Sequence, residues 1–478
     1  MIEIKDEFVT EKTELKQELG LFSAMTIVMG SMIGSGVFIV TADVARGLGN
    51  REYTLLAWIF ASVMTVMGAA SYSRLAAAYP HSGGQYVFIR EAWGKLLAFL
   101  YGWAMIFVIQ GGFLAAVGTA FAKFAGVIWP IISNHNTLFW LPFGFEITTA
   151  KLLAISSILL LSAFNVRGVK EGAILQNVFT TLKVLAVLAV IFLGFAATTL
   201  FHYSPPLITK SLTHYPVADI KQLWWLLPTF AVGPLFSSDA WNNVTFIGGE
   251  IKNPERIIPK ALILGTVSVC LIYIITNLAY FSVLPLVWIQ NAPEDRVATL
   301  VLEQLFGPTG ALMMAGAILI STFGCLNGMI MAGARVIYAM AKDGLFFKQF
   351  EALDPKFLTP KKALIAQGLW ASFLALTGTY LALLDYIVFT ALIFYVVTVL
   401  GSYQLAKAGK IVLPTFWSRV LPFAYSILIT YVALILAFTK PSNTLPGLLL
   451  VLLGIPIYAV WKKYYEDKKL QPLENSRL

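Results

Sequence analysis

Two apolar stretches of the sequence are interrupted by residues that weaken a helix and offer polar groups to a small molecule. Residues 30–36 read GSMIGSG, and residues 230–243 read FAVGPLFSSDAWNN. Glycine destabilises a helix interior by about 1 kcal/mol. The first segment also fits close helix packing through Gly30 and Gly34, a small-xxx-small pair. The second would be costly in lipid and is expected to line a cavity, so we predict that both helices are unwound here.

The broken ends of such helices can hold a zwitterion. The N-terminus of a half-helix carries partial positive charge, and the C-terminus carries partial negative charge. A carboxylate is then expected against the amides around Ser35, Gly36 and Val37, and an ammonium group against carbonyls near Ile33 and Phe236. The predicted binding residues are Ile33, Gly34, Ser35, Gly36, Val37, Phe236, Ser237, Ser238 and Asp239.

Lys183 lies near the middle of the apolar stretch 173–198. About 15 Å of helix separates it from the start of that stretch, so its ammonium cannot reach an interface by extending its side chain. One interpretation is a lysine in a wet cavity with no specific role. We favour a coupling role, with the ammonium bound to carbonyls at the negative end of the first half-helix. The expected partners are the carbonyls near Gly30 and Ile33 and the hydroxyls of Ser321 and Thr322.

Several charged residues lie at or near the second interruption. Asp239 could contact a cationic group of a bound molecule, or it could accept hydrogen bonds from backbone amides at a helix end. We favour the second interpretation, because a helix break supplies such amides in any case. Glu250 and Arg256 are expected to form an ion pair in a gate or a loop, and Arg335 is expected at the same end of the bundle.

The composition is that of a membrane protein. Of 478 residues, 58% are hydrophobic and 12% are charged, whereas soluble domains average about 25% charged. A disordered chain, a coiled coil and an ordinary cytosolic enzyme are therefore excluded. The net charge of +9 does not indicate a nucleic-acid partner, because basic residues mark the cytoplasmic side of membrane proteins. The sequence has no Walker A or HExxH motif, and we predict no enzymatic activity, cofactor or metal.

The apolar stretches predict twelve membrane spans. They cover residues 21–44, 54–79, 93–127, 149–166, 173–198, 223–249, 259–283, 309–340, 363–384, 386–406, 420–438 and 445–460. Most Lys and Arg fall on one side if both termini, residues 1–20 and 461–478, are cytoplasmic. The interruptions fall in spans one and six, as expected if residues 21–198 and 223–406 are inverted repeats of a core over 21–406, with two additional spans over 420–460.

Three motifs carry a resemblance to a known family. Residues 34–38 (GSGVF), 80–86 (PHSGGQY) and 236–259 resemble those of the amino acid–polyamine–organocation transporters. Within the third motif, WNNVTF followed by EIKNPER is especially similar to the L-type amino acid transporter branch. The resemblance implies an all-α LeuT-type fold of ten core helices plus two, and transport of an L-amino acid by alternating access. It also implies that Phe236 covers the substrate and that Ser35, Gly36, Phe236 and Ser237 hold its backbone.

The resemblance has departures and limits. The family often has an aromatic residue where Ser238 stands and glycine where Ala240 stands, which affects the size of the pocket. Animal L-type transporters bind a glycoprotein subunit through a loop cysteine, but Cys270 and Cys325 both lie in apolar stretches and the loop 129–145 has none. We therefore expect a single-chain, monomeric protein of the bacterial inner membrane, with no disulfide-linked heavy subunit.

The function expected from the residues and the resemblance together is sodium-independent exchange of neutral L-amino acids across the lipid bilayer. A fixed ammonium at Lys183 would stand where sodium-coupled relatives hold a cation. Proton-coupled amino acid symport and antiport of cationic amino acids or polyamines remain alternatives. A channel is less favoured, because one break per repeat differs from the repeated filter loops or pore-lining charges of channels.

Overall fold

The computed structural model describes residues 15, 17–142, 145–200, 212–377 and 380–474, in which helices joined by loops make up the fold, with one small hairpin. The first half contains α1 (Leu21–Met32), α2 (Gly36–Leu48), α3 (Arg51–Ala78), α4 (Gln85–Trp93), α5 (Lys95–Ala104), a π-helical turn (Met105–Gln110), α6 (Gly111–Ile128), α7 (Thr149–Asn165) and α8 (Val169–Thr199). The second half contains α9 (Leu223–Phe230), α10 (Val232–Ser237), α11 (Asn243–Phe246), α12 (Pro254–Val283), α13 (Leu286–Gln290), α14 (Val297–Lys342), α15 (Lys361–Thr377), α16 (Tyr380–Lys407), α17 (Phe416–Thr439) and α18 (Pro441–Glu474).

Each predicted apolar stretch coincides with one or more of these helices. Within the described ranges, nine helical segments are long and apolar enough to cross a membrane. The fourth stretch forms the shorter apolar helix α7, the sixth is divided among α9, α10 and α11, and the ninth covers most of α15 and the start of α16. The structure is therefore that of a multi-pass membrane protein, and the number of twelve spans stays a prediction.

Both predicted helix breaks are present. α1 ends at Met32 and α2 begins at Gly36, with Ile33 in a non-helical conformation between them. In the other break, α10 ends at Ser237 and the backbone turns through Ala240, whose φ is 62°. An alanine in this left-handed region costs of order 1–3 kcal/mol, so the position favours glycine.

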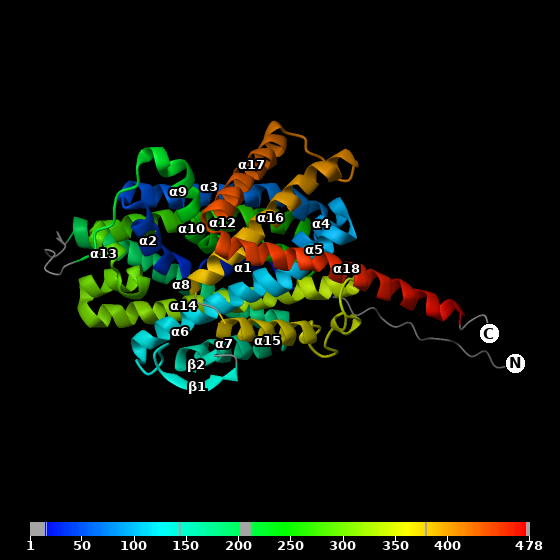
Figure 1. The fold of residues 1–478 in the computed structure, drawn as a ribbon, viewed down its shortest axis with the longest axis horizontal. Coiled ribbons are helices and arrows are strands. Elements are labelled where there is room, and N and C mark those ends of the chain that lie inside the picture. The colour runs from blue at the N-terminus through cyan, green and yellow to red at the C-terminus, as the bar shows by residue number, and fades with distance from the viewer. Residues whose placement is uncertain (1–14, 16, 143–144, 201–211, 378–379, 475–478) are drawn as a thin grey trace.

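The broken helices lie inside the bundle. α1 packs against α12, α8 and α14, and α10 packs against α2, α16 and α3. Figure 1 shows α1 and α10 near the centre, with α17 and the β-hairpin towards opposite sides of the view. A continuous hydrophobic cluster fills the interior and includes side chains from both broken segments. The two breaks are thus shielded from lipid by surrounding helices, as their polar backbone requires.

The connections differ from the sequence expectation at two places. The loop expected over residues 129–145 contains strand β1 (Thr137–Leu141), which pairs antiparallel with β2 (Phe145–Thr148). The predicted C-terminal tail continues the last helix, since α18 extends to Glu474. Most of the predicted N-terminal tail, residues 1–20, lies outside the described residues. Its last part contacts the core, where Leu19 forms a parallel bridge with Ile251.

Candidate functional site

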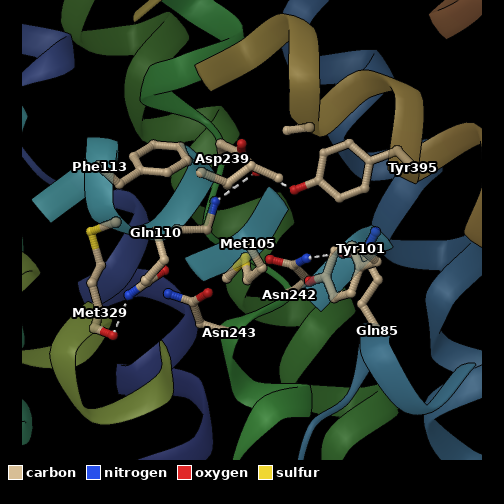
Figure 2. A pocket seen from close by; sticks show the side chains of 13 residues that line it. Gln85, Tyr101, Met105, Gln110, Phe113, Asp239, Asn242, Asn243, Met329 and Tyr395 are labelled. Atoms are coloured by element: carbon tan, nitrogen blue, oxygen red, sulfur yellow. Dashed lines mark hydrogen bonds between the residues drawn. The ribbon is translucent and has the colours of Figure 1, made fainter. Parts of the chain in front are cut away.

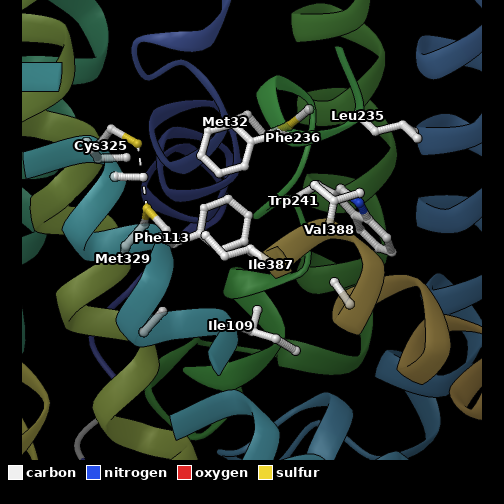
Figure 3. Close-up of a cluster of buried hydrophobic side chains, with 14 of the residues drawn as sticks. Met32, Ile109, Phe113, Leu235, Phe236, Trp241, Cys325, Met329, Ile387 and Val388 are labelled. Atoms are coloured by element: carbon white, nitrogen blue, oxygen red, sulfur yellow. Dashed lines mark hydrogen bonds between the residues drawn. The ribbon is translucent and has the colours of Figure 1, made fainter. Parts of the chain in front are cut away.

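The two helix breaks touch each other. A β-carbon added to Gly36 would lie 2.0 Å from Ser237 Oγ and 3.0 Å from Ser237 Cα, so no side chain fits there. The ring of Phe236, at the end of α10, stacks on Phe113 of α6 with centroids 4.7 Å apart (Figure 3). Glycine at position 36 therefore allows a close approach of the two backbones, and the stacked ring of Phe236 belongs to the residue next to Ser237 in this contact.

Tyr273 of α12 joins the two breaks. Its hydroxyl lies 2.8 Å from the carbonyl oxygen of Met32 and 3.0 Å from that of Ser237, and the side chain is fully buried. A phenol has one proton, so it donates to one of these carbonyls at a time. The sequence analysis missed this residue, because a tyrosine in an apolar stretch carries no signal of its partners.

Lys183 belongs to α8, and its ammonium group lies at the C-terminal end of α1. Its Nζ is 2.7 Å from the carbonyl oxygens of Gly30 and Ile33 and 3.1 Å from that of Ser321. These three acceptors match the three donors of an ammonium group. The side chain has no exposed surface, and within the described part of the chain no carboxylate lies within 4 Å of it. The contacts to Gly30 and Ile33 are those expected from the sequence, whereas the role of Lys183 stays a prediction.

The prediction that the hydroxyls of Ser321 and Thr322 bind the Lys183 ammonium was wrong. Ser321 offers the ammonium its carbonyl, and its hydroxyl lies 3.2 Å from the carbonyl oxygens of both Ile33 and Gly34, donating to one of them at a time. The hydroxyl of Thr322 donates to Ile318 O in the preceding turn of α14, at 2.8 Å. Helical Ser and Thr commonly bond to the carbonyl four residues earlier, and this local bond outcompetes the distant one for Thr322.

The carbonyls expected to bind an ammonium group already accept hydrogen bonds. Ile33 O accepts from both Lys183 and Ser321, and Phe236 O accepts from the backbone N–H of Asp239 at 3.1 Å. A carbonyl oxygen has two lone pairs, so an ammonium at Ile33 would replace a donor. The N-terminus of α2, which begins at Gly36, lies at the break, and in its first turn the N–H of Phe38 donates to Ser35 O at 3.1 Å. The N–H groups at the start of a helix have no carbonyl four residues earlier within the helix, so this end can bind an anion.

The polar side chains of the second break bond mainly to their own helix ends. The hydroxyls of Ser237 and Ser238 donate to the carbonyls of Gly233 and Pro234, at 2.8 and 2.9 Å. Asp239 Oδ1 accepts from the N–H of Ala240 at 2.8 Å and from the hydroxyl of Tyr395. The contact with the Ala240 amide is of the kind expected for an acid at a helix end. Within the described residues, Asp239 has no Lys or Arg within 4 Å.

A cavity of about 20 Å³ lies directly beside the second break (Figure 2). Such a volume has room for roughly one water molecule and not for an amino acid. Its walls come from α4, α5, the π-helical turn, α6, the break, α14 and α16. The lining residues are Gln85, Tyr101, Met105, Ile109, Gln110, Phe113, Asp239, Ala240, Asn242, Asn243, Met329, Ala391 and Tyr395.

A buried ion pair lies at the end of the bundle predicted to be cytoplasmic. Arg335 Nε lies 2.8 Å from Glu250 Oε1, and Arg335 Nη2 lies 3.2 Å from Glu250 Oε2. Both side chains are 1% exposed, and Nη1 donates to Met331 O at 2.6 Å. The sequence analysis expected Glu250 to pair with Arg256. That expectation was wrong, because the partner of Glu250 is Arg335. The carbonyl of Glu250 also accepts from the N–H groups of Glu18 and Leu19.

A second group of charges lies near this ion pair. Arg90 pairs with Glu91 and with Asp343, which also accepts from the hydroxyl of Tyr86. Burial raises the pKa of Glu91, but hydrogen bonds and charge from Arg90 and Lys410 outweigh burial and hold that pKa below its ordinary value. These contacts tie α4 to the end of α14 and to the residues that follow α16.

Comparison with known proteins identifies the family. A family model described as amino acid permease matches residues 19–458, which include both breaks, Lys183 and the buried ion pair. The chain belongs to this family. It is 29% identical to the serine/threonine exchanger SteT of Bacillus subtilis over 459 residues, 95% of this chain and 99% of that protein. It is 26% identical to the Asc-type amino acid transporter 1 of Mus musculus, over 94% and 82% of the two chains.

A human relative extends the comparison. The chain is 28% identical to the b(0,+)-type amino acid transporter 1 of Homo sapiens, over 95% of this chain and 89% of that protein. The predicted resemblance to L-type transporters of the amino acid–polyamine–organocation superfamily is therefore confirmed. The family and these relatives are amino acid transporters and not enzymes. The two cysteines of this permease, Cys270 and Cys325, are both buried and free, so no loop cysteine is present for a disulfide-linked partner.

Proposed function

We propose that this permease exchanges neutral L-amino acids across the membrane without sodium, by alternating access between the two broken helices. The observation that carries the proposal is the Lys183 ammonium, which lies 2.7 Å from the carbonyls of Gly30 and Ile33. A sodium ion at this point would need several oxygen ligands. The carbonyls that would supply them already bind a fixed positive charge, so a free cation is not required to stabilise the negative end of α1.

The two breaks supply partners for an amino acid backbone. The carboxylate is placed against the N–H groups at the start of α2, around Ser35, Gly36 and Val37. The ammonium is placed near the carbonyls of Ile33 and Phe236. At Ile33 it replaces a hydrogen bond made within the protein, whereas Phe236 O accepts one bond, from the Asp239 N–H, and can accept a second. Binding would therefore rearrange the contacts of the first break, which supports a coupling of substrate binding to conformational change.

The local partners of Asp239 support the proposal of a neutral substrate. Asp239 Oδ1 is held by the Ala240 amide and by Tyr395, so the carboxylate has local partners before any substrate enters. This arrangement argues against a site built for cationic amino acids or polyamines. Phe236, stacked on Phe113, is placed as the lid over the bound substrate.

We place this site in a LeuT-type fold of twelve spans, with inverted repeats over residues 21–198 and 223–406 and two further spans over 420–460. The breaks in the first and sixth apolar stretches support that assignment, because they occupy equivalent positions in the two repeats. The distribution of Lys and Arg supports cytoplasmic termini in a bacterial inner membrane. The buried cysteines support a single chain, which we place as a monomer.

Counter-transport in proteoliposomes tests this function. Liposomes loaded with an unlabelled neutral amino acid should take up a labelled one from sodium-free buffer, and empty liposomes should take up much less. Uptake should saturate with external substrate. Uptake driven by a proton gradient in empty liposomes would instead favour symport, strong competition by arginine or putrescine would favour the cationic alternative, and unsaturable flux would favour a channel.

A further inference from the structure

The cavity beside the second break is built on an irregular helix. Between α5 and α6 the backbone forms a π-helical turn, Met105–Gln110, and three of its residues line the cavity: Met105, Ile109 and Gln110. π-helical turns are rare and occur frequently at functional sites. The third span is thus irregular at the level of the break in the sixth, although residues 105–110 contain no glycine or proline.

Most polar groups in the cavity wall bond to each other. Gln85 donates to Thr398 Oγ1 at 3.0 Å and accepts from Asn242 at 2.9 Å. Gln110 donates to the carbonyl of Met329 at 2.6 Å, and Tyr395 donates to Asp239. These bonds fix the wall before a ligand enters.

Two polar groups in the same wall lack a partner. The Nδ2 of Asn243 and the hydroxyl of Tyr101 are buried without a hydrogen bond in the described structure, and the two residues are 2% and 1% exposed. A buried polar group left unpaired costs about 1–3 kcal/mol, so such groups normally have a partner. In the view of Figure 2 the side chains of Met105 and Asn242 are drawn between those of Asn243 and Tyr101, and all four line the cavity. Met105 is flexible and can move aside for a ligand.

The unpaired groups define the chemistry of the missing partner. Asn243 Nδ2 is a donor and requires an acceptor oxygen, whereas the phenol of Tyr101 can donate or accept. A hydroxyl or a carboxamide satisfies both requirements. A methyl group satisfies neither, and an ammonium or guanidinium has no acceptor to offer Asn243.

The cavity is also placed where a substrate side chain would go. Phe113 lines the cavity and stacks on Phe236. Asp239 and Ala240 also line it, and they closely follow Ser237, which contacts Gly36. An amino acid whose backbone binds at the two breaks, beside the contact of Gly36 with Ser237, therefore has this cavity near its side chain. The small volume suits a short side chain, even after Met105 moves.

We propose that this cavity selects amino acids with a short, uncharged, hydrogen-bonding side chain over apolar ones of the same size, through Asn243 and Tyr101. The inference rests on the proposed exchange function and specifies its substrate class: hydroxyl and carboxamide amino acids. An apolar side chain of equal size fits the space but leaves both groups unpaired, so it binds more weakly.

Competition by isosteric pairs tests the inference in proteoliposomes. Threonine against valine, and asparagine against leucine, differ in hydrogen bonding far more than in volume. The polar member of each pair should inhibit exchange at a concentration roughly tenfold lower than the apolar member. Asn243→Leu and Tyr101→Phe should each bring the two members to within about threefold, mainly by weakening the polar one.

Tyr280→Phe is the matched control, because the Tyr280 hydroxyl is also buried without a partner but does not line the cavity. It should keep the wild-type ratio. Exchange in which valine and leucine compete as well as threonine and asparagine would overturn the inference, leave the exchange function standing, and indicate a cavity that holds water only. Preference for lysine or arginine would also overturn it. Absence of any amino acid exchange would overturn the proposed function and the inference together.

Discussion

Replacing Arg335 by methionine is expected to open the permease at its predicted cytoplasmic end. Glu250 and Arg335 form a two-point ion pair with both side chains 1% exposed. Removing one partner of a buried pair typically costs about 3–5 kcal/mol, because the other charge stays buried and unpaired. Opening this end lets water reach Glu250 and relieves that cost. If opening relieves the whole of that cost, the equilibrium should move towards the open state by roughly two to four orders of magnitude.

A native cysteine can report this opening. Cys325 Sγ lies 3.0 Å from the carbonyl oxygen of Ser31, next to the first break, and is buried in the closed state. In a Cys270→Ala background, a maleimide reagent on the predicted cytoplasmic side should label Cys325 slowly. Arg335→Met should raise the labelling rate by about a hundredfold or more, because the rate follows the population of the open state.

A double variant separates gating from general damage. Glu250→Gln with Arg335→Met removes both charges, so it should return most of the way to the slow labelling of the background protein. The monodisperse fraction after purification controls for folding. If Arg335→Met folds normally and labels at the background rate, the ion pair does not close this end and the reasoning is refuted.

Three further predictions concern the breaks and the topology. Gly36→Val should abolish exchange with normal protein yield, because a β-carbon there lies 2.0 Å from Ser237 Oγ, while Gly316→Val, at a glycine with nothing within 4 Å, should keep it. Tyr273→Phe should slow exchange about two- to tenfold by removing the hydroxyl that joins Met32 and Ser237, as initial rates would show, and an unchanged rate would exclude that role. Tags at residues 1 and 478 should both be inaccessible from outside intact cells, and exposure of one terminus would contradict the twelve-span topology.

The features that the sequence predicted are those with a local signal. Glycine, proline and serine inside an apolar stretch weaken the helix wherever it packs, so both breaks could be located to within a few residues. Lys183 was conspicuous because a charge in the middle of a span needs partners in the protein. The nearest negative helix end belonged to the first break, and this reasoning located the carbonyls of Gly30 and Ile33.

The features that the sequence did not predict depend on distant contacts or on side-chain direction. Glu250 finds Arg335, which is 85 positions away, rather than the nearby Arg256. The ammonium of Lys183 bonds to the carbonyl of Ser321 and not to its hydroxyl, and this depends on which face of α14 is turned towards the ammonium. Tyr273 and the unpaired groups of the cavity become recognisable only when several helices are assembled, since each residue type is ordinary in its own stretch.

The dependence of exchange on Lys183 and on sodium is the most direct test of the account. Initial exchange rates of a neutral amino acid would be compared in wild type and Lys183→Ala, with sodium present on both sides and with sodium fully replaced by potassium. The account predicts equal wild-type rates in the two buffers and a strong loss in Lys183→Ala that sodium does not restore, with both proteins equally monodisperse. A steep sodium dependence of the wild type, or full activity of the alanine variant, would contradict it.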